Sequence, residues 1–362
     1  MKLPGVCSRS RAQARDAPDE VQRQEPRLFA GSLALQSQGE GPPGLQSTKT
    51  TAAGKPLQRE DFEVLKLLGR GGFAEVKLVR CLRDNQLYAM KAVEKAMLDE
   101  RRHVGDSRAW ERAKAERDIG ADACGQRFPF IVQLFAAFQS PQKLYYVFEH
   151  CPGGELLGVL VGQPKQRFGE PSAMFYSAEI TLALEHLHAR DIVHRDVRLE
   201  NMLLTSDGHV KLADFGCAKA GVSSPFARLS CTLQIGSKTS VFFPPEYLQS
   251  EAYGKDLDCW QLGVAAFLML SGGWPSEGRA WPGGLPAGSS EAAADLCRSL
   301  LARERSQRLG FPLGASALRG HAFFAGLSWS ALEARDVPTP EVGRSSGRAS
   351  SSGSGGPFPP PR

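Results

Sequence analysis

The pattern of hydrophobic and polar residues divides the chain into a strand-rich part followed by a helix-rich part. Two apolar runs, residues 130–134 and 144–148, predict strands, and a predicted helix that carries Glu116 precedes them. Three earlier runs also have the character of strands, with a glycine turn between the first two: residues 62–68, 74–80 and 86–93. The first part therefore predicts a small β-rich unit with one main helix.

The second part begins after Gly153 and Gly154 and has a helical period. Pro171 suits the first turn of a helix, and apolar residues recur at roughly helical spacing from there to Leu187. Another helix is predicted to begin near Glu291. A small antiparallel β-rich unit followed by a larger helical one predicts an α+β fold.

Both ends of the chain differ in composition from this patterned region. Residues 1–58 are rich in Arg, Gln, Gly, Pro and Ser, and residues 343–362 are rich in Ser, Gly and Pro. Such segments bury too little apolar surface to order themselves, so we expect two disordered extensions around one domain, residues 59–342. Within that domain we expect a β-rich part, a helical part and a short tail over residues 59–150, 151–325 and 326–342.

Composition and charge exclude several classes of protein. The chain has 362 residues, of which 42% are hydrophobic, but it has no apolar run of the roughly 18 residues that a membrane span needs. Its eight cysteines include no C-x-x-C pair, which argues against structural zinc and for reduced thiols in the cytoplasm or nucleus. The net charge of +5 is too small to indicate nucleic-acid binding. The sequence does not indicate an oligomeric state.

A glycine-rich turn joins the first two predicted strands. Because glycines lack Cβ, the backbone N–H groups of such a turn can lie close over phosphates, and a valine at its end offers an apolar roof for a base. Ala74 stands at the third glycine position of a G-x-G-x-x-G pattern, where its small side chain is tolerable. Glycine turns between strands are more often ordinary hairpins. The residues expected around a nucleotide are Leu68, Gly69, Arg70, Gly71, Gly72, Phe73, Ala74, Glu75 and Val76.

A lysine follows on the third predicted strand. Lys91 is embedded in an apolar stretch, and a buried lysine needs an acidic partner, which Glu116 on the next predicted helix supplies. Alternatively, Lys91 is an edge residue whose charge reaches solvent, and Glu116 is a solvated helix charge. The order of glycine turn, strand lysine and helix glutamate favours the pair.

Two acidic motifs complete the candidate chemistry. The carboxylate of Asp196, in a His-Arg-Asp motif, is suited to accept the proton of a substrate hydroxyl, and the amide oxygen of Asn201 to ligate Mg²⁺. Asp214, in an Asp-Phe-Gly motif at the end of a strand, is a hard oxygen ligand suited to Mg²⁺ bound to ATP phosphates. Each aspartate alone could be a solvated loop charge, but their order and spacing favour the joint interpretation.

With these motifs, the chain resembles a eukaryotic protein kinase over about residues 61–337, and within that family the AGC group of serine/threonine kinases. The AGC resemblance rests on five short stretches: residues 115–119, 153–156, 206–209, 321–324 and 327–331. It implies the bilobal protein-kinase fold, with a small β-rich lobe and a larger helical lobe. It also implies transfer of the γ-phosphoryl group of ATP, with Mg²⁺ as cofactor, to serine or threonine of protein substrates.

The resemblance implies roles for individual residues. Lys91, paired with Glu116, would contact the α- and β-phosphates of ATP, and Asp196 would be the catalytic base. Asn201 and Asp214 would be the metal ligands. The other residues expected in the ATP site are Ala89, the gatekeeper Phe148, Glu149 and Cys151 through their backbones, Glu155 and Leu203.

Three charged residues suggest the nature of the substrate. Arg198 is expected among the catalytic residues, in contact with the γ-phosphate. It stands two positions after Asp196, where serine/threonine kinases usually carry lysine, so the basic residue favours serine and threonine over tyrosine. Arginine keeps the charge but presents a wider fork. Glu155 and Glu200 resemble the acidic residues with which AGC kinases accept arginines that precede the phosphorylated residue, which predicts a basic substrate motif. Alternatively, Glu155 touches only the ribose and Glu200 only its own loop.

The resemblance also implies structural anchors and a regulatory site. Asp258 would brace the catalytic loop, and Glu246 would form a buried pair with Arg308. Thr232 resembles an activation-loop site for an upstream kinase, and its phosphate would pair with Arg195. The rival sites are Ser230 and Ser237.

Three departures from the family pattern predict atypical regulation. Gly120 stands four residues after Glu116, where a bulky apolar residue usually joins the two lobes. Residues 276–290 are few and rich in Gly, Pro and Ala, so a helix that usually lies there is expected to be absent. After Pro338 there is no Phe-x-x-Phe motif.

Two other functions stay open at this stage. The first is a pseudokinase or scaffold that binds ATP or a partner without turnover, which Gly120, Arg198 and the shortened region favour. The second is a small-molecule or lipid kinase of the same fold. It is disfavoured because Asp258 and the Pro-Pro-Glu stretch ending at Glu246 are typical of protein kinases.

Overall fold

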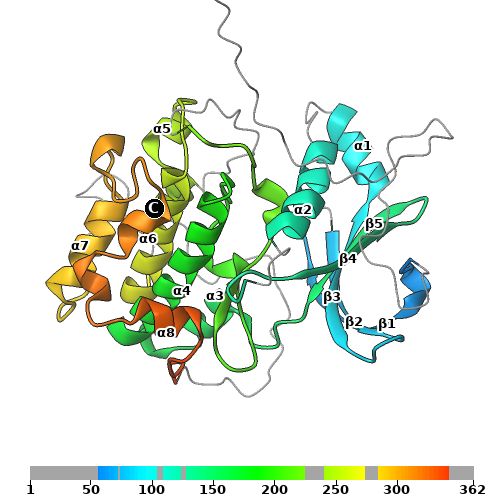
Figure 1. The fold of residues 1–362 in the computed structure, drawn as a ribbon, viewed down its shortest axis with the longest axis horizontal. Coiled ribbons are helices and arrows are strands. Elements are labelled where there is room, and N and C mark those ends of the chain that lie inside the picture. The colour runs from blue at the N-terminus through cyan, green and yellow to red at the C-terminus, as the bar shows by residue number, and fades with distance from the viewer. Residues whose placement is uncertain are drawn as a thin grey trace, which may run out of the picture. The chain divides into compact units, whose positions relative to one another are not determined.

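The computed structural model describes residues 56–71, 74–103, 109–123, 128–224, 240–273 and 284–341. The N-terminal part is an antiparallel five-stranded sheet in the order β1-β2-β3-β5-β4, and the C-terminal part is mostly helical (Figure 1). The α+β fold predicted from the sequence is confirmed. The strands are β1 Phe62–Arg70, β2 Ala74–Cys81, β3 Leu87–Glu94, β4 Leu134–Gln139 and β5 Lys143–Glu149.

The register of this sheet sorts its side chains onto two faces. Val76 lies opposite Lys91, and Ala89 lies opposite Phe148, so these four side chains share one face. The alternate positions point to the other face, where they form an apolar cluster with Leu57: Phe62, Val79, Cys81, Met90, Ala92, Ala136, Phe138, Tyr145 and Val147. One face is therefore closed by hydrophobic packing, and the other presents Lys91.

Two helices follow β3 in the chain. The longer one is the predicted helix that carries Glu116, whereas the shorter one was not predicted. The longer helix packs through Ala113 against Val93 and Tyr146, and the Tyr146 hydroxyl donates to the Ala113 carbonyl at 2.7 Å. This packing covers the face of the sheet that presents Lys91. The two helices are α1 Lys95–His103 and α2 Ala109–Ala123.

The strand predicted over residues 130–134 is wrong in position, since the strand is β4 and begins at Leu134. The segment before β4 instead pairs with the helical part of the chain, where the Val132 N–H donates to the Leu212 carbonyl at 3.0 Å. That segment is as apolar as a strand because it is buried on all sides. The real strand was missed because Ala136 and Ala137 give it weak strand character.

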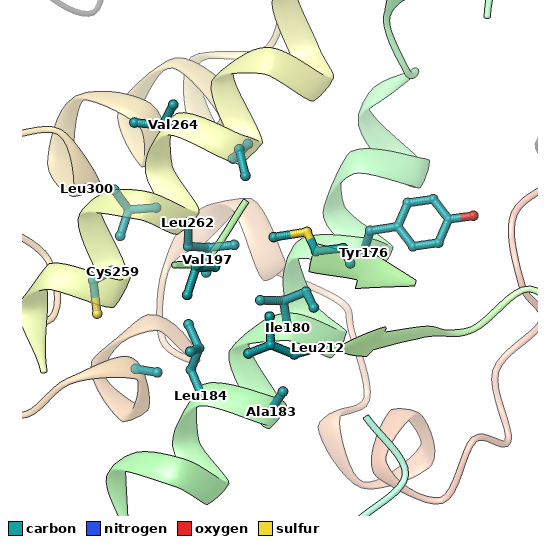
Figure 2. Close-up of a cluster of buried hydrophobic side chains, with 14 of the residues drawn as sticks. Tyr176, Ile180, Ala183, Leu184, Val197, Leu212, Cys259, Leu262, Val264 and Leu300 are labelled. Atoms are coloured by element: carbon teal, nitrogen blue, oxygen red, sulfur yellow. The ribbon is translucent and has the colours of Figure 1, made fainter. Parts of the chain in front are cut away.

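The helical part is built around α4 and α6. Figure 2 shows Ile180 and Leu184 of α4 gathered with Leu262 of α6, Leu300 of α7 and Leu212 of β8. All positions of α6 before its last residue are buried, as in a helix that passes through a core. The helices are α3 Leu156–Val161, α4 Glu170–His188, α5 Pro245–Leu248, α6 Asp256–Ser271, α7 Glu291–Leu300 and α8 Trp329–Glu333.

A second, three-stranded sheet in the order β6-β7-β8 carries the loops of the candidate site. Its strands are β6 Gly154–Glu155, β7 Met202–Leu204 and β8 Val210–Leu212. Among the described residues, 3₁₀ turns occur at 59–61, 164–166, 199–201, 215–217, 240–242, 305–307, 315–318 and 322–324. The turn at 199–201 ends at Asn201, directly before β7, and the turn at 215–217 follows Asp214, two residues after the end of β8.

Several predictions fall largely outside the described residues. The predicted extensions, residues 1–58 and 343–362, lie outside them except at residues 56–58, where Leu57 is buried. Residues 276–283 also lie outside, and the described residues 284–290 contain no helix. The helix α4 begins at Glu170, next to Pro171, and α7 begins at Glu291, so both predicted helix starts are confirmed. None of the described helices combines the length and the hydrophobicity that crossing a bilayer requires.

Candidate active site

Three charged side chains from separate elements meet beside β3. Lys91 Nζ lies 2.6 Å from Glu116 Oε1 on α2 and 3.2 Å from Oδ1 of Asp214, which follows β8. Burial alone would lower the pKa of Lys91, but the carboxylates of Asp214 and Glu116 outweigh burial and raise it. Lys91 in turn holds the pKa of Asp214 below its usual range. The predicted pair of Lys91 and Glu116 is therefore formed, and Lys91 also bonds Asp214 of the Asp-Phe-Gly motif.

The backbone of the Asp-Phe-Gly motif fixes the direction of the Asp214 carboxylate. Asp214 has a left-handed φ of 61°, and its Oδ1 accepts the Gly216 N–H at 3.1 Å. A Cβ on Gly216 would lie 3.1 Å from that oxygen, so any other residue there would crowd the Asp214 carboxylate, while Glu116 Oε2 would be at an ordinary contact distance of 3.6 Å. Phe215 is buried with its ring edge-on to His194.

Asp196 and Asn201 lie together on the loop between α4 and β7. Asn201 Nδ2 donates to both the carbonyl oxygen and Oδ2 of Asp196, each at 2.8 Å. Burial raises the pKa of Asp196, while the charges of Arg198 and His194 act in the opposite direction. Because Asn201 anchors Oδ2, the direction of the Asp196 carboxylate is fixed before any substrate arrives.

Two buried side chains of α6 hold this loop by its backbone. Asp258 accepts the N–H groups of His194 and Arg195 at 2.8 and 2.7 Å, which is the contact expected of a residue that braces this loop. Gln261, which was not predicted, accepts the Val197 N–H and donates to the Arg195 carbonyl, both at 2.9 Å. The three-residue spacing of Asp258 and Gln261 on a helix puts them on one face, a signal that could have found Gln261.

His188 supports Asp258 from the end of α4. Its Nδ1 accepts the Ala315 N–H at 3.0 Å, so the proton lies on Nε2, which donates to Asp258 Oδ2 at 2.9 Å. The sequence offered no signal for this role, because Asp258 is 70 positions away and Ala315 is 127. His188 therefore orients the Asp258 carboxylate, which in turn holds the backbone at His194 and Arg195.

The expected adenine site has a partly exposed apolar lining. Val76, Ala89, Phe148 and Leu203 are partly buried, and Leu68 is 40% exposed, so apolar surface remains available to a planar base. Of the glycine turn, Gly69 lies opposite Val76, whereas Gly72 and Phe73 lie outside the described residues. Arg70 and Glu75 form an exposed ion pair with each other at 2.6 Å.

The segment after β5 is held by Glu149. Its carboxylate accepts Lys211 Nζ at 2.7 and 2.8 Å and the Gln133 N–H at 2.7 Å. Next to it, the carbonyl of Cys151 accepts the Gly154 N–H at 3.2 Å, and burial raises the pKa of the Cys151 thiol to about 12. The backbone expected to meet adenine is thus rigid, and its cysteine is a packed thiol.

The oxygen donors of Asn201 and Asp214 fit Mg²⁺. Asn201 directs its amide nitrogen to Asp196, which leaves the amide oxygen as the atom for a cation. The Asp214 side chain is 46% exposed, and its pKa is lowered, so an anionic oxygen is accessible. Within the described residues, no group of three His, Cys, Asp or Glu side chains converges on a metal position. Two protein ligands suit Mg²⁺ that arrives with phosphates and water.

The structure also forms the predicted buried pair outside the site. Arg308 is fully buried and donates to Glu246 Oε1 and Oε2 at 2.5 and 3.0 Å. The predicted phosphosite Thr232 and its rivals Ser230 and Ser237 lie outside the described residues. Arg195, the expected partner of a Thr232 phosphate, donates to the Cys217 carbonyl at 2.5 Å and to the Tyr253 hydroxyl at 3.1 Å.

Replacing Gly120 with alanine is expected to stabilise the protein. A Cβ on Gly120 would lie 3.6 and 3.7 Å from the Leu134 side chain, which is ordinary packing distance. Alanine favours a helix interior by about 1 kcal/mol, which corresponds to a rise of about 2–4 °C in the unfolding midpoint. Gly263→Ala on α6 is the control, since its Cβ would lie 2.7 Å from Leu300 Cβ and should destabilise. Calorimetry that ranks the two variants in the opposite order would refute this.

The two site aspartates are expected to change stability in opposite directions. The pKa of Asp196 is raised by burial, so its ionisation increasingly disfavours the folded state as pH rises above the unfolded pKa. The pKa of Asp214 is lowered, so its ionised form favours the folded state above the unfolded pKa. Near pH 7 with a chelator, Asp196→Asn should raise the unfolding midpoint and Asp214→Asn should lower it. The Asp196 difference should shrink as pH falls toward the unfolded pKa of about 4, whereas the Asp214 difference should persist there and be lost only as pH falls further, through the lowered folded pKa. Shifts of equal sign in the two variants are the contrary result.

Comparison with known proteins places this chain in a family. Residues 62–324 match the protein kinase domain family. The chain is 33% identical over 299 residues to the human serine/threonine-protein kinase Sgk2, covering 80% of this chain and 77% of that protein. It is 36% identical over 293 residues to ribosomal protein S6 kinase 2 alpha of Gallus gallus, and 33% identical over 303 residues to protein kinase C zeta type of Oryctolagus cuniculus. The latter matches cover 77% and 78% of this chain.

The chain therefore belongs to the protein kinase family, and its relatives are serine/threonine kinases of the AGC group. The chain spans only 37% of the avian S6 kinase and 49% of the rabbit protein kinase C. The predicted resemblance is confirmed at the level of the family.

Proposed function

We propose that this chain is an ATP-dependent protein serine/threonine kinase, with ATP as phosphoryl donor. The observation that carries the proposal is Lys91, held 2.6 Å from Glu116 and 3.2 Å from Asp214. A cation so placed is suited to the α- and β-phosphates of ATP. Bound Mg²⁺, held by Asn201 and Asp214, would neutralise charge on the transferred group.

Asp196 is assigned as the catalytic base. The substrate hydroxyl oxygen forms a bond to the γ-phosphorus, the bond from that phosphorus to the oxygen of the departing ADP breaks, and the hydroxyl proton passes to the Asp196 carboxylate. The support for this role is that Asn201 and the backbone bonds to Asp258 and Gln261 fix the loop. Preorganised geometry of this kind is the main contribution a protein makes to phosphoryl transfer.

The substrate class we assign is a protein segment with basic residues upstream of the serine or threonine. Its support is the pair of acidic residues Glu155 and Glu200. Partial burial and the charge of Glu200 raise the pKa of Glu155, a residue of β6 that remains exposed to an arriving arginine. An upstream activating kinase acting on Thr232 also belongs to this proposal, as does action in the cytoplasm or nucleus.

The alternative is a scaffold that binds nucleotide without turnover, and one observation favours it. Arg198, at the position expected to contact the γ-phosphate, is bonded to Glu200 instead. A single comparison separates the two functions: Mg²⁺-dependent phosphorylation of basic peptides by the full chain and by Asp196→Asn. A kinase should lose about 10²–10⁴-fold in rate when its general base is removed. Equal background rates, with nucleotide binding intact, would establish a scaffold.

A further inference from the structure

The Arg198 side chain forms an ion pair within its own loop. Its guanidinium donates to the carboxylate of Glu200, two residues later, and both side chains are about one-third exposed or less. The Arg198 Cζ also lies 5.4 Å from the centroid of the Phe242 ring, within range of a cation–π contact. The Glu200 carboxylate and the Phe242 ring together therefore set the direction of the Arg198 guanidinium.

The Arg198 side chain is not fully satisfied in this position. Among the described residues, its Nε is buried and has no hydrogen-bond partner. A buried N–H without a partner costs free energy, so a rotation that pairs Nε with an acceptor has a driving force. The pair with Glu200 thus holds Arg198 in a state that a competing anion can improve.

Glu200 is also one of the two carboxylates assigned to a substrate arginine. A substrate guanidinium and Arg198 would therefore compete for the same oxygens. Arginine bonds a carboxylate through a planar fork, whereas a lysine ammonium is a point charge on a flexible stem. Because residue 198 is an arginine, the two groups that compete for Glu200 are both guanidinium groups.

We propose that Arg198 and Glu200 form a latch, which a substrate arginine opens by taking Glu200 and releasing Arg198 toward the γ-phosphate of ATP. The proposal rests on the proposed function and adds regulation by substrate to it. Peptide recognition and γ-phosphate binding are then coupled through one side chain. The coupling must be reciprocal, so a basic peptide strengthens ATP binding and ATP strengthens peptide binding.

The test is calorimetric titration of the full chain with Mg²⁺-ATP and, separately, with Mg²⁺-ADP. Each titration is run alone and with a saturating peptide that has upstream arginines and alanine in place of the phosphorylated residue. In the wild type the peptide should tighten ATP binding at least about 5-fold, as coupled sites typically do, and leave ADP binding unchanged. A peptide whose arginines are replaced by alanine should have no effect on either nucleotide.

Two variants locate the coupling. Arg198→Lys and Glu200→Gln should each lose the coupling, because the first replaces the planar fork with a point charge and the second removes the charge for which the two arginines compete. Arg319→Lys is the matched control, since Arg319 forms an exposed pair with Glu185 and should keep the coupling. Equal ATP affinity with and without the basic peptide in the wild type would overturn the latch, as would coupling that survives in Arg198→Lys.

The coupling measured in these titrations does not depend on turnover, because the peptide cannot be phosphorylated. Phosphorylation of a serine peptide by the same preparation tests the proposed function separately. Turnover without coupling removes the latch and leaves the kinase. Coupling without turnover keeps the latch and removes the kinase activity.

Discussion

Replacing Lys91 with methionine is expected to lower kcat for peptide phosphorylation about 10²–10³-fold, the usual effect of removing one preorganised charge from an active site. Lys91 is the only cation that the structure places within hydrogen-bond distance of both Glu116 and Asp214 among the described residues. Its removal leaves Glu116 buried without its partner, and burial already raises the pKa of Glu116. The side chain that orders α2 against β3 would then be lost together with the phosphate contact.

Lys143→Met is the control for this prediction. Lys143 pairs with Glu94 at 2.6 Å on the same sheet, but both side chains are partly exposed. Such surface pairs contribute about 0–1 kcal/mol to stability, so the control should keep its activity. Steady-state kinetics of both variants, with folding checked by circular dichroism, would refute the assignment if Lys91→Met kept near wild-type kcat.

Replacing Arg308 with methionine is expected to destabilise the fold by about 3–5 kcal/mol, the cost of removing one partner from a buried ion pair. Arg308 donates to Glu246 and, at 3.0 Å, to Asp256, which also accepts two bonds from Arg305. The guanidinium also lies over the Trp260 ring at 5.0 Å. Without it, Glu246 is left as a buried carboxylate that methionine cannot satisfy.

Arg319→Met is the control for Arg308→Met. Arg319 makes a bidentate pair with Glu185, but its side chain is 40% exposed. Its loss should cost no more than about 1 kcal/mol. Urea unfolding at pH 7 measures both changes, and equal losses in the two variants would contradict the structural role given to the buried pair.

Much of the site could be predicted because its residues are close in sequence or lie on regular elements. The glycine turn, Lys91 on its strand and Glu116 on its helix were each placed by local patterns, and the sheet register then set Lys91 on the face that α2 covers. Asp196 and Asn201 stand on one short loop, so their spacing placed them in the same region, although the bond between them was not predicted. Short-range order of this kind is visible in hydrophobic periodicity and motif spacing.

The parts that could not be predicted depend on contacts between residues far apart in the chain. His188 and Gln261 support the loop of Asp196 through bonds that span 64 positions or more. The helical spacing from Asp258 could have indicated Gln261, but nothing in the sequence indicates His188. The position of β4 was missed for a related reason. The apolar run before it owes its hydrophobicity to burial against β8, which only the tertiary structure reveals.

Arg198 was expected to contact a phosphate, and its bond to Glu200 was not foreseen. Both residues were named separately from the sequence, one for phosphate and one for a substrate arginine. Their contact forms where the extended backbone at Arg198 enters the turn over residues 199–201, and the sequence motifs did not indicate this contact.

The most direct measurement of the central claim is phosphoamino-acid analysis after incubation with ATP labelled on the γ-phosphate. The full chain and Mg²⁺ are incubated with a mixture of basic peptides that differ only in carrying serine, threonine or tyrosine. The serine/threonine kinases among its relatives and the basic Arg198, two positions after Asp196, predict label on serine and threonine, and none on tyrosine. Label on tyrosine alone, or nucleotide bound with label on no peptide, would contradict it.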